Sequence, residues 1–277
     1  MNLLLHYLSW LSGFLAGVKW PAPVRRLLLK CFVRLYGIEM QEAEKPLESY
    51  NSLNQLFIRD IRAELRPTGE GIVAPVDGVL RDFGKIDGDH INSIKGQSYS
   101  LKEFLADQHV AERFIDGNYL YFYLSPRHAH HIFSPIDGRI YSYTHIPGAL
   151  WPVNSWGVEK VARLLVVNER VVNLIDTEVG VVALVMIAAT NVGKIELHYL
   201  KKIVRDKFLL RPAGRKIERI ALEPPVKVIR AEKLGTFHLG SAVVVLFEKN
   251  AVSFSESLQR ESEVKYGESV GLPLRRE

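Results

Sequence analysis

The residues most able to do chemistry lie in two short segments of the 277-residue chain. Three of its nine histidines, His128, His130 and His131, fall within four consecutive positions. Histidine titrates near neutral pH, so it is the side chain best suited to move protons there. The second segment is Gly240-Ser241, which directly precedes a strongly apolar run. These residue types indicate proton transfer at the first segment and a serine nucleophile at the second.

The bond between Gly240 and Ser241 is a plausible target of the Ser241 hydroxyl itself. Attack on the Gly240 carbonyl moves the acyl group from nitrogen to oxygen, and glycine leaves that carbonyl open because it has no Cβ. A general base must take the hydroxyl proton, and hydrogen-bond donors must stabilise the oxyanion. β-Elimination and hydrolysis then leave a pyruvoyl group on the new N-terminus. Its ketone can form a Schiff base with an amine substrate and accept electrons as CO2 leaves.

A metal site is the competing interpretation of the histidines. In an extended segment, alternation places His128 and His130 on one face and His131 on the other. With Asp77 or Asp137 as a third ligand, the first two would suit zinc. Because no second dense cluster of ligands occurs in the sequence, we expect no metal.

The two aspartates belong to a short internal repeat. Pro75-Val76-Asp77-Gly78 is echoed 60 residues later by Pro135-Ile136-Asp137-Gly138. Proline followed by Asp-Gly and a β-rich run is typical of a tight turn that opens a strand. We interpret Asp137 as a turn residue, and a catalytic role for Asp77 needs further support.

The elements that must position these residues are mostly short strands. From Gly71 onward, β-rich runs are separated by glycine and proline, which predicts an α+β fold with a mostly antiparallel β body and flanking helices. The expected strands are Val79–Phe83, Tyr119–Leu124, Arg139–His145, Arg170–Asp176, Val181–Ala188, Lys194–Tyr199, Val226–Arg230 and Ala242–Phe247. The expected short helices are Ser52–Ile58, capped by Asn51 or Ser52, Leu101–Ala106 and Val158–Leu165.

Composition and charge limit the classes of function. The chain is 47% hydrophobic and 24% charged, which is ordinary for a folded protein. Its single cysteine, Cys31, excludes a disulfide framework and suits a reducing compartment. Lysine and arginine number 36 against 31 acidic residues, but residues 1–38 hold five bases and no acid. The rest of the chain is therefore balanced, which argues against a nucleic-acid partner.

Residues 1–38 form a basic arm with two predicted helices, and residues 39–277 form the body. In the first helix, His6, Ser9, Gly13 and Gly17 recur every three or four residues and share one stripe. The second follows Pro21 and Pro23. Its expected apolar face consists of Val24, Leu27, Leu28, Cys31, Phe32 and Leu35, beside the bases Arg25, Arg26, Lys30 and Arg34.

We interpret the arm as a pair of interfacial amphipathic helices on an anionic membrane. Trp10 and Trp20 bracket the first stretch, as interfacial aromatic residues often do. A spanning helix would be marginal, because residues 2–18 include glycines and serines. A signal peptide is disfavoured, since nothing positive precedes the apolar run. Two ordinary helices that cover a core remain the alternative.

Several motifs in order through almost the whole chain resemble the bacterial, membrane-associated phosphatidylserine decarboxylases. They are Ala74-Pro75-Val76-Asp77-Gly78, Tyr123-Leu124-Ser125-Pro126-Arg127, Pro147-Gly148 with Val153-Asn154, Asn168-Glu169-Arg170-Val171, Asp176-Thr177-Glu178, Ala189-Thr190-Asn191-Val192-Gly193 and Gly235-Thr236-Phe237-His238-Leu239-Gly240-Ser241. This family converts phosphatidylserine to phosphatidylethanolamine and CO2 through a self-made pyruvoyl group. An Asp-His-Ser set carries out its cleavage.

The resemblance implies roles for individual residues. Asp77 looks like the acid of the set, and Ser241 looks like the pyruvoyl precursor that forms the Schiff base. His130 matches the first family histidine, which looks like the residue near the substrate imine. Cleavage between Gly240 and Ser241 would give a beta chain of residues 1–240 and an alpha chain of residues 241–277. The implied location is the cytoplasmic side of the cell membrane, as a peripheral protein, and the sequence leaves open whether two copies form a homodimer.

Two positions depart from the family pattern. The second family histidine, the base paired with the acid, falls on Phe133, which cannot move a proton. His131 or His128 is a possible substitute base, although alternation turns His131 away from His130. The threonine that usually follows the serine is Ala242. An unprocessed, catalytically inactive membrane-binding homologue is therefore the alternative function.

Overall fold

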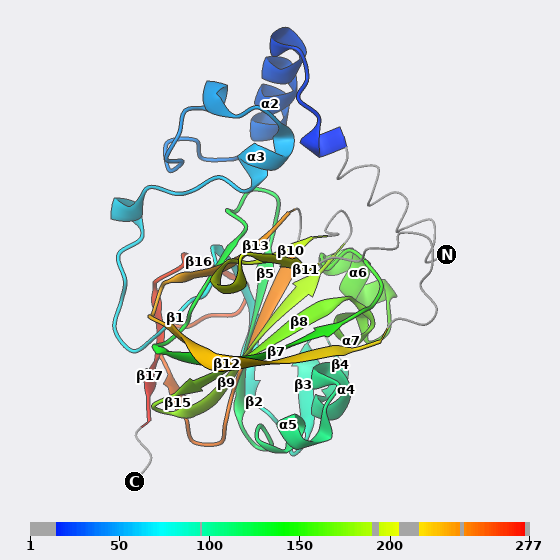
Figure 1. Cartoon of the computed structure of the whole chain (residues 1–277), viewed down its shortest axis with the longest axis vertical. Helices are drawn as coiled ribbons and strands as arrows, with labels where there is room; N and C mark the ends of the chain where they lie inside the picture. The colour runs from blue at the N-terminus through cyan, green and yellow to red at the C-terminus, as the bar shows by residue number, and fades with distance from the viewer. Residues whose placement is uncertain (1–14, 95, 190–193, 205–215, 239–240, 275–277) are drawn as a thin grey trace.

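An eight-stranded antiparallel sheet forms the centre of the molecule (Figure 1), in the order β12-β7-β8-β9-β14-β5-β2-β16. The computed structural model describes residues 15–94, 96–189, 194–204, 216–238 and 241–274. The strands of the central sheet are β2 (Gly78–Lys85), β5 (Asn118–Leu124), β7 (Gly138–Ile146), β8 (Arg170–Thr177), β9 (Gly180–Ala188), β12 (Glu218–Val228), β14 (Ser241–Phe247) and β16 (Ser262–Val264). The α+β class with a mostly antiparallel β body is confirmed.

Three smaller sheets surround the central one, in the orders β11-β10-β13-β6, β1-β17-β15 and β3-β4. Their strands are β1 (Ile72–Val73), β3 (His90–Ile94), β4 (Gln97–Ser100), β6 (His131–Phe133), β10 (Ile195–Leu197), β11 (Lys202–Val204), β13 (Lys233–Phe237), β15 (Val252–Phe254) and β17 (Ser269–Pro273). The helices are α2 (Ala22–Tyr36), α3 (Leu53–Phe57), α4 (Leu101–Leu105), α5 (Gln108–Glu112), α6 (Ser155–Lys160) and α7 (Leu164–Val167), and 3₁₀ turns occupy Leu47–Ser49, Ala63–Leu65 and His198–Leu200. Figure 1 shows α2 and α3 at one end of the molecule and α4 and α5 at the other.

Strand β14 is buried on both faces of the central sheet. All seven of its residues are buried, and it pairs with β5 on one side and with β9 on the other. Val243 and Val245 join one core cluster, which contains residues of the smaller sheets, whereas Val244 and Leu246 join the cluster that contains α4 to α7. A continuous apolar run is what a doubly covered strand requires.

Most of the predicted strands are confirmed, and they lie in the central sheet. Lys194–Tyr199 is an exception, because only Ile195–Leu197 is extended before a 3₁₀ turn begins. Another exception is Val226–Arg230, which is the end of a longer strand, β12. Apart from β10, the short strands of the smaller sheets, β6 and β13 among them, were not predicted. Strands of three to five residues offer too few alternations to be recognised.

The helices near residue 160 correct the prediction of one helix over Val158–Leu165. The structure has two helices, α6 and α7, because Arg163 adopts φ 55° between them. The Gln97 side chain donates to the Val158 carbonyl and accepts from the Arg163 N–H, which stabilises the break. The other two predicted helices are confirmed as α3 and α4, and Ser52 caps α3 by accepting from the Gln55 N–H.

Helix α2 confirms the second predicted helix of the arm, and the first lies outside the described residues except at its end. Leu29 is buried against Leu56 of α3, whereas Leu27 and Leu35 are 64% and 75% exposed. The expected apolar face included the two exposed leucines and missed Leu29. The helix ends at Gly37 with φ 63°, a conformation that glycine adopts freely.

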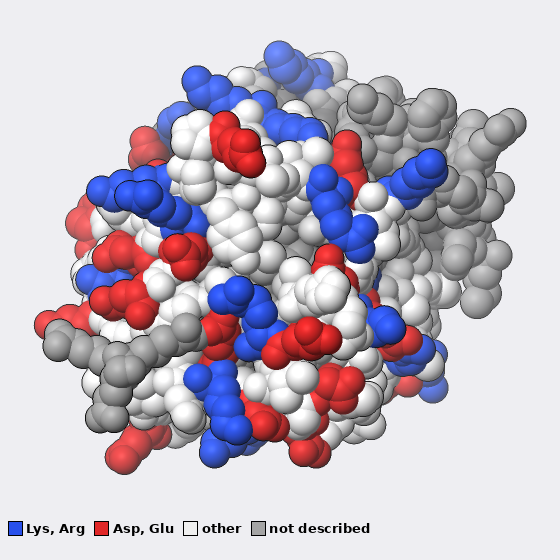
Figure 2. Space-filling view, turned by 60° about the horizontal axis from the view of Figure 1, so that its bottom comes forward, with Lys and Arg blue, Asp and Glu red and all other residues white. Residues whose placement is uncertain are grey.

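Exposed leucines on a basic helix fit an interface with lipid. No helix within the described ranges is long and apolar enough to cross a bilayer. Figure 2 shows basic and acidic side chains interspersed over the face of the body that it presents, in agreement with the balanced charge of that part of the sequence.

Candidate active site

Ser241 opens β14 with its side chain sealed in the protein. The residue is fully buried, and its Oγ has no hydrogen-bond partner among the described residues. Its backbone is held on both sides, because Ser241 is opposite Leu124 of β5 and Ala188 of β9. A buried hydroxyl without a partner costs about 1–3 kcal/mol, which is unusual in a core strand. Gly240, the other half of the predicted scissile bond, lies outside the described residues.

Asp77 is buried at the turn that opens β2, and an arginine holds it in a fork. Arg66 donates from Nε to Oδ1 at 3.0 Å and from Nη2 to Oδ2 at 2.8 Å. The Tyr266 N–H also donates to Oδ1, at 2.9 Å. The repeat partner Asp137 is exposed and accepts from the Arg230 N–H, which fits its interpretation as a turn residue.

Phe133, to which the sequence resemblance assigns the position of the second family histidine, lies in β6. Its ring is stacked on Tyr266, with centroids 3.7 Å apart and an interplanar angle of 9°. Tyr266 is the residue whose N–H binds Asp77. An aromatic pair therefore lies beside the Asp77 carboxylate, and no imidazole of the described residues donates to it.

His130 is fully buried, and its ring lies 3.9 Å from that of Phe57, centroid to centroid. Its Nδ1 is 2.9 Å from the His128 carbonyl, which can only accept, so Nδ1 carries the proton. Nε2 is then a bare acceptor, and it is buried without a partner among the described residues. Burial also lowers the pKa of His130 well below its usual 6.5, so the ring is neutral at pH 7.

His131 lies on the same face of β6 as Phe133, because the two are separated by one residue. Their ring centroids are 6.4 Å apart. Its Nε2 is 3.1 Å from the Asp60 Oδ1, and its Nδ1 is 2.8 Å from the Thr236 Oγ1 on β13. The hydrogen bonds of His131 and Lys233 lower the pKa of the Asp60 carboxyl. An ionised carboxylate opposite Nε2 favours a proton there and a lone pair on Nδ1.

His128 has both ring nitrogens engaged. Its Nδ1 accepts from the Ser125 N–H at 3.0 Å, so the proton is on Nε2, which is 2.8 Å from the Glu263 Oε2. Burial, followed by the nearby Arg127, lowers the pKa of His128 to about 4. With no free lone pair, His128 is poorly placed to accept a proton.

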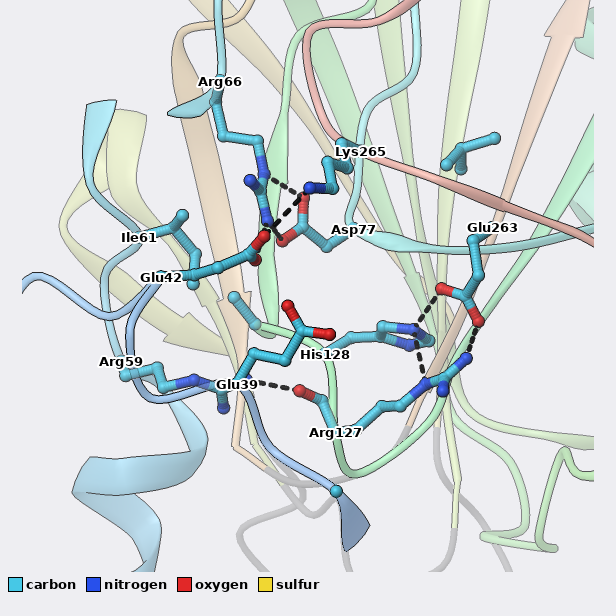
Figure 3. A pocket seen from close by; sticks show the side chains of 13 residues that line it. Glu39, Glu42, Arg59, Ile61, Arg66, Asp77, Arg127, His128, Glu263 and Lys265 are labelled. Carbon is cyan, nitrogen blue, oxygen red and sulfur yellow. Dashed lines mark hydrogen bonds and ion pairs between the residues drawn. The ribbon is translucent and has the colours of Figure 1, made fainter. Parts of the chain in front are cut away.

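A pocket of about 270 Å³ brings Asp77 and His128 together. Figure 3 shows Arg66, Asp77 and Lys265 on one side of it and Arg59 and Arg127 on the other. Gly37, Glu39 and Glu42, which follow α2, also line the pocket. The pocket therefore lies where the N-terminal arm joins the body.

Sequence reasoning did not identify Asp60, Arg66 and Arg59 as site residues. All three follow the predicted helix Ser52–Ile58, in a segment that contains none of the motifs of the family resemblance. Thr236 belongs to the Gly235–Ser241 motif, but the sequence predicted no individual role for it. Within the described ranges, no group of three or more His, Cys, Asp or Glu residues is arranged to hold a metal ion.

Comparison with known proteins identifies the family. The family model for phosphatidylserine decarboxylase matches residues 53–272, which is most of the chain. The chain belongs to the phosphatidylserine decarboxylase family. It is 35% identical to the phosphatidylserine decarboxylase proenzyme of Myxococcus xanthus strain DK1622 over 96% of this chain and 93% of that protein. It is 36% identical to the proenzymes of Coxiella burnetii strain RSA 493 and Escherichia coli O45:K1, over 95% of this chain in both cases and 93% and 84% of those proteins.

The motif Asn168-Glu169-Arg170-Val171, which contributes to the resemblance to the phosphatidylserine decarboxylase family, has a structural role in this chain. The Arg170 guanidinium is buried and donates to the backbone carbonyls of Glu103, Phe104, Val166 and Asn168. Burial lowers its pKa to about 10. Arg170 therefore joins α4 and α7 to the start of β8.

The state of His130 makes the stability of this decarboxylase fold depend on pH. The folded chain holds the ring neutral, whereas the unfolded chain binds a proton near pH 6.5, so unfolding takes up a proton in acid. We expect the free energy of unfolding to fall as the pH drops below about 6.5. His130→Gln should flatten this slope by up to about 1.4 kcal/mol per pH unit. The free energy of unfolding, measured in urea at pH 7 and at pH 5, gives this dependence on pH. The same dependence in the wild type and in His130→Gln would show that His130 is charged in the fold.

Proposed function

We propose that this chain decarboxylates phosphatidylserine to phosphatidylethanolamine after self-cleavage between Gly240 and Ser241. The observation that carries the proposal is the Ser241 hydroxyl, fully buried and unpartnered at the first position of the central strand. Membership of a family whose relatives are named proenzymes supports the processing step.

The residues around Ser241 fit a covalent pyruvoyl group at this position. The Ser241 backbone stays paired with β5 and β9, so a group made from this residue would be held at a fixed end of the sheet. Its side-chain atoms would lie out of water, since the residue is fully buried. When present, the pyruvoyl group supplies an electrophilic ketone for the substrate amine and an electron sink for the loss of CO2.

His130 is suited to proton transfer in the decarboxylation. Its bare Nε2 can accept a proton from the substrate ammonium, which must be neutral before it attacks a carbonyl. The same nitrogen can return the proton to the α carbon once CO2 has left. The low pKa of His130, caused by burial, keeps Nε2 unprotonated before the reaction and makes the protonated ring a strong proton donor.

His131 is the better candidate for the base of self-cleavage. It shares a face of β6 with Phe133, and Asp60 faces its Nε2 at 3.1 Å, so an Asp60–His131 pair would replace the family's acid and base. Its Nδ1 lone pair now faces the Thr236 hydroxyl, five residues before Ser241 on the same segment. The lone pair of the His128 Nδ1 is bound by the backbone N–H of Ser125, which is a fixed donor, whereas the Thr236 hydroxyl at the His131 Nδ1 can turn to the His198 Nε2, also 2.8 Å away. Asp77 is occupied by Arg66.

The arm is proposed to hold the protein on an anionic membrane surface, as a peripheral protein on the cytoplasmic side. Support comes from the exposed Leu27 and Leu35 of α2 and from the basic residues beside them. The phospholipid substrate would then be presented next to the end of α2, where the pocket lies.

Replacing Ser241 should abolish cleavage and activity together. In Ser241→Ala the nucleophile is absent, so we expect only uncut chain on a denaturing gel and no CO2 release from phosphatidylserine. Ser269→Ala, at an exposed serine that begins β17, is the control and should behave as the wild type. A Ser241→Ala chain that still decarboxylates would rule out the pyruvoyl mechanism, and a wild-type chain that stays uncut would favour the inactive membrane-binding homologue.

The identity of the base is tested by three glutamine variants. We expect His131→Gln to accumulate uncut chain, because the rate of cleavage should fall about 100-fold or more, which is the usual contribution of a general base. His128→Gln should cleave like the wild type, and His130→Gln should cleave but decarboxylate slowly. Adding Phe133→His to His131→Gln should recover cleavage, whereas Phe133→Leu should not. Normal cleavage by His131→Gln would exclude the Asp60–His131 pair.

The exposed leucines of α2 should contribute to membrane binding. Leu27→Ser with Leu35→Ser is expected to weaken binding to phosphatidylglycerol-containing vesicles about tenfold or more, because both side chains lose apolar contact with lipid. Leu272→Ser, 58% exposed on β17, is the control. Binding by the wild type should also fall with added salt. If the double variant bound vesicles as tightly as the wild type, α2 would not contact lipid through these leucines and would only cover the core.

A further inference from the structure

The charged residues around the pocket are almost all paired with one another. Arg66 binds Asp77 and Glu42, and Lys265 binds Glu42 as well. On the other side, Glu263 pairs with Arg127 and faces the His128 Nε2. Each of these charges therefore has an opposite charge within hydrogen-bond distance.

Arg59 is the exception among the buried charges of the pocket. The residue is 4% exposed, and its Nε has no hydrogen-bond partner among the described residues. Its Nη1 and Nη2 donate only to the backbone carbonyls of Leu56 and Arg127, and no described carboxylate forms an ion pair with it. Burial lowers the pKa of Arg59. The other unpaired charge of the lining, Glu39, is exposed and can be solvated by water.

A buried guanidinium needs either a full set of acceptors or an anion. Arg170 shows the first solution, because four backbone carbonyls accept from its Nε, Nη1 and Nη2. Arg59 has only two carbonyl acceptors and a buried Nε without a partner among the described residues, and the residue lines an open pocket. Figure 3 shows the side chain extending toward Arg127, opposite the Arg66–Asp77 pair.

We infer that Arg59 binds the phosphodiester of the lipid headgroup. This inference rests on the proposed function and names the residue that would hold the part of the substrate that does not react. A pocket of about 270 Å³ is near the lower end of the roughly 300–1,000 Å³ that ligand pockets span, which suits a polar headgroup and not its acyl chains.

The substrate has two anionic groups, and the reaction distinguishes between them. The carboxylate loses its charge as CO2 departs, so a guanidinium bound to it would stabilise the ground state and oppose decarboxylation. The phosphodiester keeps its charge throughout. A cation on that group adds the same stabilisation before and during the reaction, and it anchors the substrate without a penalty to the chemical step.

The position of Arg59 agrees with this assignment. Phe57, two residues earlier, contacts the ring of His130. His128, which lines the pocket, binds Ser125, and Ser125 follows the Leu124 that pairs with Ser241. Arg59 thus lines one pocket with His128, which follows β5, and with Gly37, which ends α2, so a headgroup in this pocket would have its phosphodiester within reach of Arg59.

The test is a kinetic comparison in detergent micelles with a varied mole fraction of phosphatidylserine. We expect Arg59→Met to mature normally and to raise KM roughly 10- to 100-fold, the effect of losing a hydrogen bond to a charged group. The value of kcat should change less than about threefold, because the binding lost is uniform. Arg59→Lys should recover part of the loss in KM. Arg62→Met is the matched control, since it removes the same charge from an exposed position three residues away.

Two soluble probes separate the phosphodiester from the carboxylate, and both carry a primary ammonium group. Glycerophosphoethanolamine has the phosphodiester alone, and L-serine has the carboxylate alone. By calorimetry on the full-length protein, glycerophosphoethanolamine should bind the wild type more tightly than L-serine does, and Arg59→Met should weaken only the former. Equal or tighter binding of L-serine to the wild type would overturn the inference even where Arg59→Met fails to fold.

The outcomes also separate this inference from the proposed function. A wild type that neither cleaves nor releases CO2 contradicts the proposed function, while probe binding still reports on Arg59. A wild type that is active, with an unchanged KM in Arg59→Met, contradicts only the assignment of Arg59.

Discussion

The position of Ser241 at the first residue of a strand buried on both faces is the constraint on which the rest of the site depends. Hydrogen bonds to β5 and β9 fix its backbone, and the apolar residues that follow it anchor the strand between two core clusters. A strand held in this way would stay in the sheet after the chain is cut before it. The same burial leaves its hydroxyl without a partner among the described residues, which is a cost that the proposed chemistry explains.

Around this fixed point, the acid and base groups are arranged differently from what the family motifs alone suggest. Asp77 is held by Arg66 and the Tyr266 N–H, and Phe133 is stacked on Tyr266. The carboxylate–imidazole pair on the Phe133 face of β6 is Asp60 with His131. Under the proposed function, Asp60 and His131, which lies two residues from Phe133 on β6, would supply the acid and base of self-cleavage.

The sequence predicted the parts of this structure that depend on long, regular patterns. Ala242–Phe247 is a continuous apolar run, and the structure places it in the middle of the sheet. The apolar periodicity after Pro21 likewise predicted α2. The family motifs placed Asp77 and Ser241 in order, but they contained no information about Arg59 or Asp60, whose roles arise from contacts with residues about 70 positions away, Arg127 and His131. The tautomers of the three histidines could not be predicted either, because each depends on one hydrogen bond across a loop or a sheet.

The central claim is that the chain cuts itself before Ser241, and the intact mass of the protein purified from its native cells tests it most directly. Under denaturing conditions, the account predicts two polypeptides, of which the smaller comprises residues 241–277 with a pyruvoyl group in place of the N-terminal serine. A single polypeptide with the uncut mass of 31.4 kDa would contradict it.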